Sequence, residues 1–291
     1  MTSPLIKTGA RVLAAIDASA YATSVASHAA WAATRLDAPL EFLHAIDRTT
    51  APVTADLSGN LSLGSQEELL AKLAAVDEQR GRLAQEHGRL LLEQVRAQVA
   101  ASHDASAEIR QRHGALVDTL LELESDVRLF VLGKRGEHAT LAKAHLGSNL
   151  ERVVRAVHRP VLVASREFRT ISRFMVAFDG SATTRKCVEM VCASPLLKGL
   201  ACDVLVVGDA SATIDQHLQW ARAQLQAAGF DPRCQVVAGS PDAVIAQQAT
   251  ELAIDLLVMG AYGHSRIRSL IVGSTTTQVL RTVEIPVLLL R

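Results

Sequence analysis

The feature that most constrains the fold of this 291-residue sequence is an internal repeat. The segment "RVLAAIDAS" (11–19) matches "RFMVAFDGS" (173–181), and both read as a short apolar strand that ends in Asp and Ser. Further along, "RPVLVA" (159–164) matches "IPVLLL" (285–290). Self-similarity at this distance indicates a duplicated structural unit. A chain of this length can bury a core in each of two such units.

Each copy alternates short apolar runs with amphipathic segments. In the second copy, strands are predicted near 173–178, 202–207, 233–238, 254–259 and 286–290. Helices are predicted near 182–194, 211–228, 241–252 and 274–283. This alternation is typical of a parallel sheet that helices cover on both faces. We therefore predict an α/β fold with one domain at 1–165, a linker at 166–172 and a second domain at 173–291.

The first copy is longer because of a helical insertion at about 50–102. Its segment 66–102 has no proline and carries Leu and Ala at helical spacing. This predicts one long helix, or two helices broken near Gly81 or Gly88. The insertion is either a surface elaboration that buries one stripe or an arm that docks a partner.

The composition excludes several classes of function. Lys and Arg number 30, as do Asp and Glu, so no excess positive charge predicts nucleic acid as a partner. No apolar run reaches membrane-spanning length and the N-terminus lacks a signal-peptide pattern, so we expect a cytoplasmic protein without a membrane partner. The four cysteines show no CxxC pair, which predicts reduced thiols and no metal ligands.

The segment "VMGAYGHSRIRSLIVGSTTTQVL" (258–280) follows an apolar run and is rich in small residues. Gly260 and Gly263 can take positive φ and let a ligand approach the main chain. Gly273, Ser274 and Thr275 begin the next predicted helix, where free N–H groups and the helix dipole suit an anion.

Charged and polar residues near these glycines have two readings each. His264, Arg266 and Arg268 could contact phosphate, or they could lie in solvent. Asp179 could accept hydrogen bonds from ribose or cap the following helix, and Ser274 could be an N-cap alone. No GxxxxGK[ST] or GxGxxG motif occurs at the expected places, so the residues alone predict only a phosphate site.

The spacing Gly260-x2-Gly263-x9-Gly273-Ser274, in a copy that begins "FMVAFDGS" and ends "IPVLLL", resembles the universal stress protein family. The resemblance covers nearly the whole chain, twice. It implies an open five-stranded sheet of order 3-2-1-4-5 in each domain. It also implies an intrachain pseudo-dimer in which residues 161–163 pair with 287–289, covering two apolar strand edges.

In the nucleotide-binding branch of that family, this motif holds the phosphates and ribose of ATP, and adenine lies near the end of the second strand. The resemblance thus implies that ATP, or AMP or ADP, binds here with or without Mg²⁺. Together with the motif's polar residues, the expected nucleotide-binding residues are Asp179, Val207, Gly260, Gly263, His264, Arg266, Gly273, Ser274 and Thr275. No catalytic residue and no metal ligand from the protein is expected.

The first copy departs from this spacing. Ten residues instead of nine separate Gly136 from Gly147, and Lys134 and Arg135 lie between the first two glycines. These cations could strengthen phosphate binding, or Arg135 could fill the cleft. The second candidate site consists of Asp17, Ala45, Gly133, Gly136, Gly147, Ser148 and Asn149.

Three functions fit this pattern. The first is a nucleotide-binding regulatory or sensor protein of stress physiology, the second a slow ATPase, and the third an interaction scaffold with empty clefts. The complete second motif favours the first over the third. The sequence offers no identifiable general base, which disfavours the second. The expected partners are an adenine nucleotide, an unidentified protein and, as an open alternative, a second copy of the chain.

Overall fold

A computed structural model describes residues 9–47, 63–103, 105–136, 147–261 and 274–291. The strands of the first half are β1 (Arg11–Ala15), β2 (Leu40–Ile46), β3 (Ala107–His113), β4 (Val127–Gly133) and β5 (Val161–Ala164). Its helices are α1 (Ala22–Leu36), α2 (Leu63–His103), α3 (Leu116–Leu123), η1 (Glu124–Asp126) and α4 (Ser148–Ala156).

The second half repeats this order without the long helix. Its strands are β6 (Arg173–Ala177), β7 (Ala201–Val207), β8 (Pro232–Val237), β9 (Leu256–Gly260) and β10 (Val287–Leu290). Its helices are α5 (Ala182–Ala193), η2 (Pro195–Leu197), α6 (Ala212–Ala227), α7 (Pro241–Glu251) and α8 (Ser274–Thr282). These bounds confirm the strands and helices predicted for this copy.

All the strands form one ten-stranded sheet of order β3-β2-β1-β4-β5-β10-β9-β6-β7-β8. Within each half every neighbouring pair is parallel, and the order in each half is the expected 3-2-1-4-5. Parallel strands of this kind need crossover connections, which the intervening helices supply. The α/β prediction is confirmed, with the two sheets merged into one.

The halves join where β5 pairs with β10 in antiparallel register. Val161 lies opposite Leu289 and Val163 opposite Val287, which is the pairing expected from the two apolar C-terminal strands. Because this pair is antiparallel and all others are parallel, the strands of one half run opposite to those of the other. The carboxyl ends of the strands of one half therefore point in the opposite direction to those of the other half, so the two sets of strand ends lie on opposite sides of the sheet.

Two apolar layers cover the faces of the sheet and both continue across the β5–β10 junction. One layer packs side chains of α1, α2, α5 and α6 against the sheet and includes Leu162 and Leu288. The other packs α3, α4, α7 and α8 and includes Val163 and Leu289. Successive residues of a strand point to opposite faces, so apolar strands such as these must be covered on both sides.

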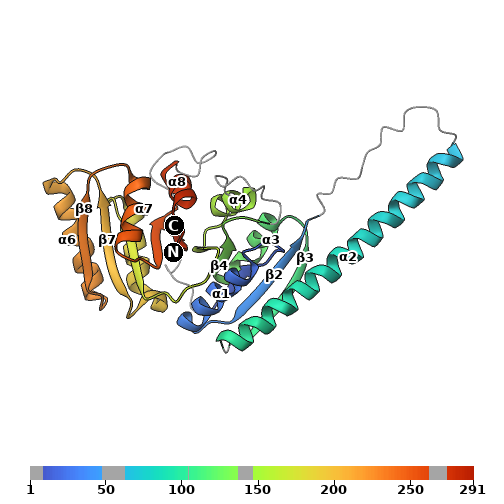
Figure 1. The fold of residues 1–291 in the computed structure, drawn as a ribbon, viewed down its shortest axis with the longest axis horizontal. Helices are drawn as coiled ribbons and strands as arrows, with labels where there is room; N and C mark the ends of the chain where they lie inside the picture. The colour runs from blue at the N-terminus through green and yellow to red at the C-terminus, as the bar shows by residue number, and fades with distance from the viewer. Residues whose placement is uncertain (1–8, 48–62, 104, 137–146, 262–273) are drawn as a thin grey trace.

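The long helix α2 is continuous from Leu63 to His103, so neither Gly81 nor Gly88 breaks it. Its C-terminal part packs on β2 and β3 through Leu92, Val95 and Val99, each at most 3 % exposed. The helix meets the sheet at Gly88, where an added Cβ would lie 2.4 Å from Cδ2 of His44. The N-terminal part of α2 projects away from the body (Figure 1).

A buried carboxylate lies at the same place in each half, beside the first strand. Glu41 of β2 is 2 % exposed and pairs with Arg11 and Arg110. Asp203 of β7 is 3 % exposed and lies 3.4 Å from Nε of Arg173.

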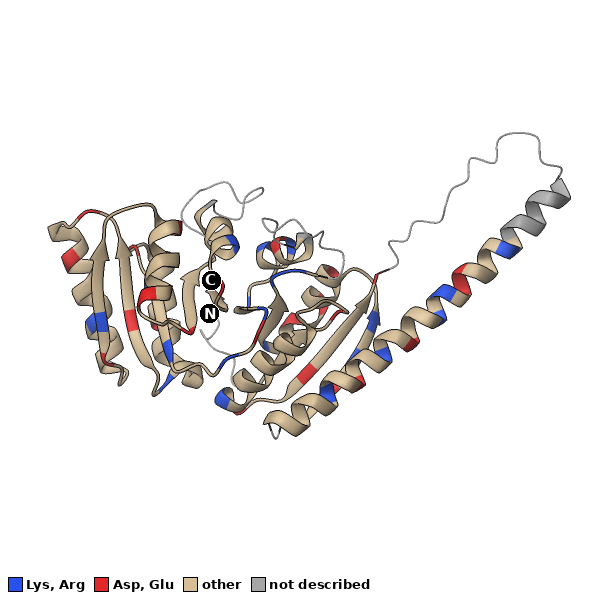
Figure 2. Cartoon of the chain, viewed as in Figure 1, with Lys and Arg blue, Asp and Glu red and all other residues tan. Residues whose placement is uncertain are grey.

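Elsewhere charged residues are spread over both halves and along α2 (Figure 2). Among the described residues, no helix is both long and apolar enough to cross a membrane.

Candidate functional site

In the second half, Asp179 follows β6 and organises the turn into α5. Its Oδ1 accepts hydrogen bonds from the backbone N–H of Ser181, at 2.9 Å, and from Oγ1 of Thr184, at 2.7 Å. Burial of the carboxyl opposes ionisation, but the bonds from Ser181 and Thr184 outweigh it and hold the pKa of Asp179 below its ordinary value. Ser181, whose side chain accepts from the N–H of Thr184, is the helix N-cap, so Asp179 fixes the turn as a charged carboxylate.

The Asp179 turn is braced from α6. Gly180 has φ +75°, and an added Cβ would lie 1.8 Å from Nδ1 of His217. Nε of Arg185 donates to the Gly180 carbonyl at 3.0 Å, and the Arg185 guanidinium lies 4.5 Å from the ring centre of Trp220. No sequence motif marks these residues, because they come from separate elements and share no motif spacing.

Gly260 ends β9, the parallel neighbour of β6, and so lies at the same sheet edge as Asp179. It does not have the positive φ that we expected of it. Instead, an added Cβ would lie 2.9 Å from Cγ2 of Thr183 in the first turn of α5. Close packing of helix on strand is therefore the observed reason for glycine here.

Val207 ends β7, on the other side of β6. The parallel register pairs Ala177 with Leu205, and two residues further it brings Val207 level with Asp179. In the first half, Ala15 pairs with Leu43, which brings Ala45 level with Asp17 in the same way. The two residues expected beside adenine thus hold equivalent places next to the two aspartates.

Five residues of the second motif lie outside the residues that the structure describes, namely Gly263, His264, Arg266, Arg268 and Gly273. Helix α8 begins at Ser274, Thr275 is exposed, and Oγ1 of the buried Thr276 donates to the Gly260 carbonyl at 3.4 Å. The start of α8 is therefore fastened to the end of β9 by Thr276, a residue that the sequence analysis did not name.

In the first half, the three glycines and Asp17 converge. An added Cβ at Gly136 would lie 3.1 Å from Oδ2 of Asp17, and one at Gly147 would lie 3.3 Å from the backbone N of Gly136. At Gly133 it would lie 2.9 Å from Cβ of Tyr21 in the turn before α1, which repeats the packing of Gly260 on α5. Gly136 and Gly147 therefore lie next to each other beside the aspartate.

The start of α4 completes the first site. Gly147 is the N-cap of α4, and its N–H donates to the Lys134 carbonyl at 3.1 Å. Ser148 is the first helical residue and Asn149, next to it, is exposed. The main-chain N–H groups of a helix's first turn are the donors that suit an anion.

Lys134 does not serve this site as one of the expected phosphate-binding cations. Its ammonium donates to the carbonyl of Val283 in the other half, and the side chain is buried. Burial lowers the pKa of Lys134 to about 8. The added cation of the first motif is therefore used at the junction between the halves.

Other chemistry is sparse in the part of the chain that the structure describes. No group of three His, Cys, Asp or Glu side chains is arranged to hold a metal ion there. Burial raises the pKa of the Cys187 and Cys202 thiols to about 12, so both are protonated and unreactive at neutral pH. A mostly apolar hollow of about 530 Å³, its open mouth included, lies between the halves, and none of the candidate nucleotide-binding residues lines it.

Fold and site together define a class of protein: a tandem parallel α/β protein with a candidate ligand site at the carboxyl edge of each half, where such sheets bind their ligands. Residues 10–165 and 203–291 match the model of the universal stress protein family. Universal stress protein Slr1230 of Synechocystis is 36% identical over 284 residues, which are 96% of this chain and 99% of the relative. Universal stress protein Rv1996 of Mycobacterium tuberculosis is 27% identical over 66% of this chain and 68% of its own length.

The chain belongs to the universal stress protein family. A solved universal stress protein from Archaeoglobus fulgidus has the same fold, with a TM-score of 0.70 at 18% identity over 96% of this chain and 98% of its own. Protein PA1789 of Pseudomonas aeruginosa aligns with a TM-score of 0.61 at 18% identity, over 97% of this chain and 93% of its own. The family resemblance seen in the repeated motif is confirmed.

Proposed function

We propose that this universal stress protein binds an adenine nucleotide, ATP or in its place AMP or ADP, and acts as a regulatory or sensor protein in a stress response. The observation that carries the proposal is the convergence of Gly136, Gly147 and Asp17 at the carboxyl edge of the first half. A Cβ at either glycine would meet the aspartate or the loop backbone within 3.4 Å. Glycines at these two positions leave the neighbouring main-chain groups open to the approach of a phosphate.

The second half supports the same site by equivalent placement. Asp179, Val207 and Gly260 end or follow the first, second and fourth strands of that half, and the strand register sets them side by side. We propose that Asp179 accepts hydrogen bonds from the ribose, since its pKa lies below the ordinary value and it is ionised at neutral pH. The other residues proposed to hold the nucleotide are Gly263, His264, Arg266, Gly273, Ser274 and Thr275.

The corresponding set in the first half is Asp17, Ala45, Gly133, Gly136, Gly147, Ser148 and Asn149. Lys134 donates to Val283 at the junction and so adds no cation to this set. We therefore expect this lysine to give the first site no gain in triphosphate affinity over the second. The proposed domains are 1–165 and 173–291, each of which carries one site.

The test is to identify what the purified protein carries. Protein prepared without added nucleotide is denatured, and the released small molecules are identified by mass spectrometry. We expect an adenine nucleotide, at up to two per chain. If none is released, the protein is titrated with ATP up to about 1 mM, near the upper end of common small-molecule affinities. Failure to release or to take up any adenine nucleotide would contradict the proposal and favour a scaffold with empty clefts.

A further inference from the structure

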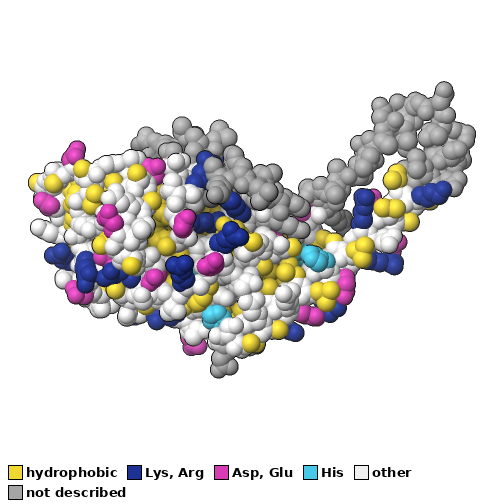
Figure 3. Space-filling model, in the orientation of Figure 1, with side chains coloured by type: hydrophobic (Ala, Val, Ile, Leu, Met, Phe, Trp, Pro, Cys, Tyr) yellow, Lys and Arg dark blue, Asp and Glu magenta, His cyan; other side chains and the backbone are white. Residues whose placement is uncertain are grey.

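Helix α2 carries apolar side chains that the body of the protein does not cover, both on its projecting part and at its base. Val76 is 44% exposed, Leu83 62% and Leu90 51%. Among the described residues only Leu121 of α3 joins them as an exposed large apolar side chain. Figure 3 shows hydrophobic side chains interspersed with charged ones along this helix. Exposed apolar side chains form a candidate contact surface only where they lie together on one face.

These three residues are spaced by seven. A spacing of seven returns to nearly the same side of a helix, so Val76, Leu83 and Leu90 form one stripe, which we call the α2 stripe. The face that packs on the sheet is the opposite one, since Leu92 is two residues from Leu90, or about 200° around the helix. The α2 stripe therefore points away from the body along its whole length. Heptad-spaced apolar residues can supply one of the two seam positions of a two-stranded coiled coil.

We infer that the α2 stripe pairs with the α2 stripe of a second copy of this chain, as a short antiparallel coiled coil. Arg80 lies beside the stripe, three residues before Leu83. In a parallel pair, Arg80 would meet Arg80 of the second copy, and like charges at that position oppose pairing. In an antiparallel pair centred between residues 80 and 83, Arg80 instead meets the partner's Leu83, and Leu90 meets the partner's Leu73.

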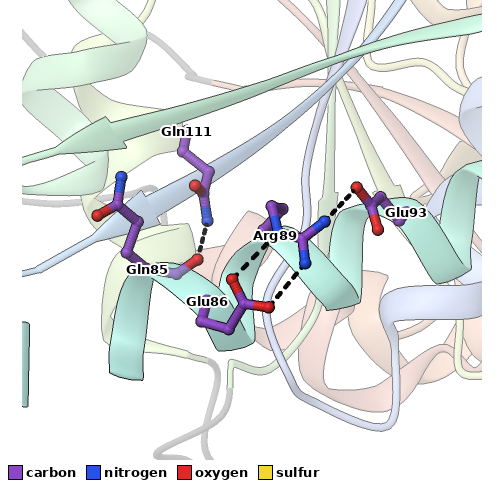
Figure 4. A network of polar contacts seen from close by, with 5 residues as sticks. All are labelled: Gln85, Glu86, Arg89, Glu93 and Gln111. Atoms are coloured by element: carbon purple, nitrogen blue, oxygen red, sulfur yellow. Dashed lines mark hydrogen bonds and ion pairs between the residues drawn. The ribbon is translucent and has the colours of Figure 1, made fainter. Parts of the chain in front are cut away.

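Charge complementarity also favours the antiparallel register. Lys72 and Glu93 flank the stripe on one side near opposite ends, and the antiparallel register sets Lys72 against the Glu93 of the second copy. Arg89 holds Glu86 at 2.7 Å and Glu93 at 2.8 Å, so both carboxylates are already positioned on the helix surface (Figure 4). The pairing is two-fold symmetric, so each Lys72–Glu93 contact forms twice.

The arm is suited to such pairing because its base is fixed. At the point where α2 leaves the body, Nε2 of Gln111 in β3 donates to the Gln85 carbonyl at 2.8 Å (Figure 4). Three residues on, Gly88 lies directly on His44. The helix is continuous through this base, so little ordering is left to oppose association. An antiparallel pair also sets the two bodies at opposite ends of the coil.

Sedimentation velocity of the full-length chain over a range of concentrations tests the inference. We expect a reversible monomer–dimer equilibrium, with Leu83→Glu raising the dissociation constant on the order of a hundredfold, because it sets a charge in the apolar seam of both chains. Two matched controls should leave the equilibrium unchanged: Leu121→Glu removes an exposed leucine elsewhere, and Ala74→Glu adds the same charge to the opposite face of the arm. Thermal unfolding of all three variants shows that they are folded.

Zero-length carbodiimide cross-linking tests the register. About 21 residues of helix separate Lys72 from Glu93 in one chain, which is about 32 Å, so a direct cross-link between them can form only between chains. We expect this cross-link in mixtures of isotopically light and heavy protein, joining one light and one heavy chain. A protein that stays monomeric, a dimer that Leu83→Glu leaves intact, or a cross-linked dimer without the Lys72–Glu93 link would each overturn the inference.

Discussion

The ammonium of Lys134 donates a hydrogen bond to the carbonyl oxygen of Val283, and this bond joins the two halves beside the β5–β10 strand pair. Lys134 is 8 % exposed, and burial lowers its pKa from 10.5 to about 8, while Glu284 opposes the shift. Lys134 belongs to the first glycine motif, yet its ammonium is used at the junction between the halves. The junction is expected to respond to pH above neutrality.

We expect Lys134→Met to abolish this response. The unfolded chain keeps its proton on Lys134 up to about pH 10.5, while the folded chain releases it near pH 8, so the unfolded state binds more protons between these values. The contribution of Lys134 to stability therefore rises with pH across that window. From pH 7 to pH 10, the free energy of unfolding of the wild type should rise by up to about 3 kcal/mol relative to that of the variant. Urea unfolding at the two pH values measures this change. A stability difference between the wild type and the variant that does not change with pH would show that Lys134 is not the cause of the pH response.

His28 should make the protein sensitive to acid. Burial lowers the pKa of His28 to about 4, although a bond of 2.7 Å between Nδ1 and the Ser24 carbonyl opposes the shift. The unfolded chain takes up this proton near pH 6.5, so stability falls as pH drops from about 6.5 to 4. His28→Gln lacks this titration, and between those pH values the wild type should lose up to about 3 kcal/mol more than the variant. Parallel pH profiles would show that His28 is not the cause.

The buried carboxylate of Glu41 should matter far more than an exposed one near it. Glu41→Gln leaves the guanidinium groups of Arg11 and Arg110 without their buried partner. The expected loss is about 2–4 kcal/mol of unfolding free energy. Glu108→Gln is the matched control, since Glu108 also lies near Arg11, at 3.6 Å, but is 76% exposed. That variant should change stability by less than about 1 kcal/mol. Equal effects in urea unfolding would contradict the role given to burial.

The apolar pattern was enough to predict most of the fold. Continuous apolar runs such as "CDVLVV" give the strands of the second half to within two residues, because such runs can be satisfied only between two layers of helix. The β5–β10 junction was expected from the family resemblance, and the two apolar last strands supported it because each would otherwise leave an open edge. Local pattern and edge covering thus determine the architecture.

Features that depend on tertiary contacts could not be predicted. Glycine in a helix signals a break by propensity, yet Gly88 is inside α2 because the helix must approach His44 closely. Its place between two glycines of the first motif suggested that Lys134 could strengthen phosphate binding, whereas its long side chain reaches the other half. The contact of His217 with Gly180 joins residues 37 positions apart, and no spacing rule reveals it.

We expect ATP to be held and not consumed at ordinary enzymatic rates. The carboxylate of Asp179 fixes its own turn through Ser181 and Thr184, so one of its oxygens is already occupied by structural bonds. Interactions that hold the ground state as firmly as the transition state give affinity without rate. Steady-state phosphate release should stay well below about 1 s⁻¹, near the low end for enzymes. A faster rate that Asp179→Asn abolishes would instead identify an ATPase.

The most direct test of nucleotide binding at the glycine loops is a calorimetric titration of ATP into nucleotide-free protein. Gly263→Val should weaken binding at the second site at least tenfold, because a branched side chain restricts the backbone and fills space that the phosphates need. Gly81→Val is the control, since an added Cβ at Gly81 of α2 meets nothing within 4 Å. The account predicts wild-type affinity for the control and a lost or weakened site in Gly263→Val. Equal ATP affinity and stoichiometry in all three proteins would contradict it.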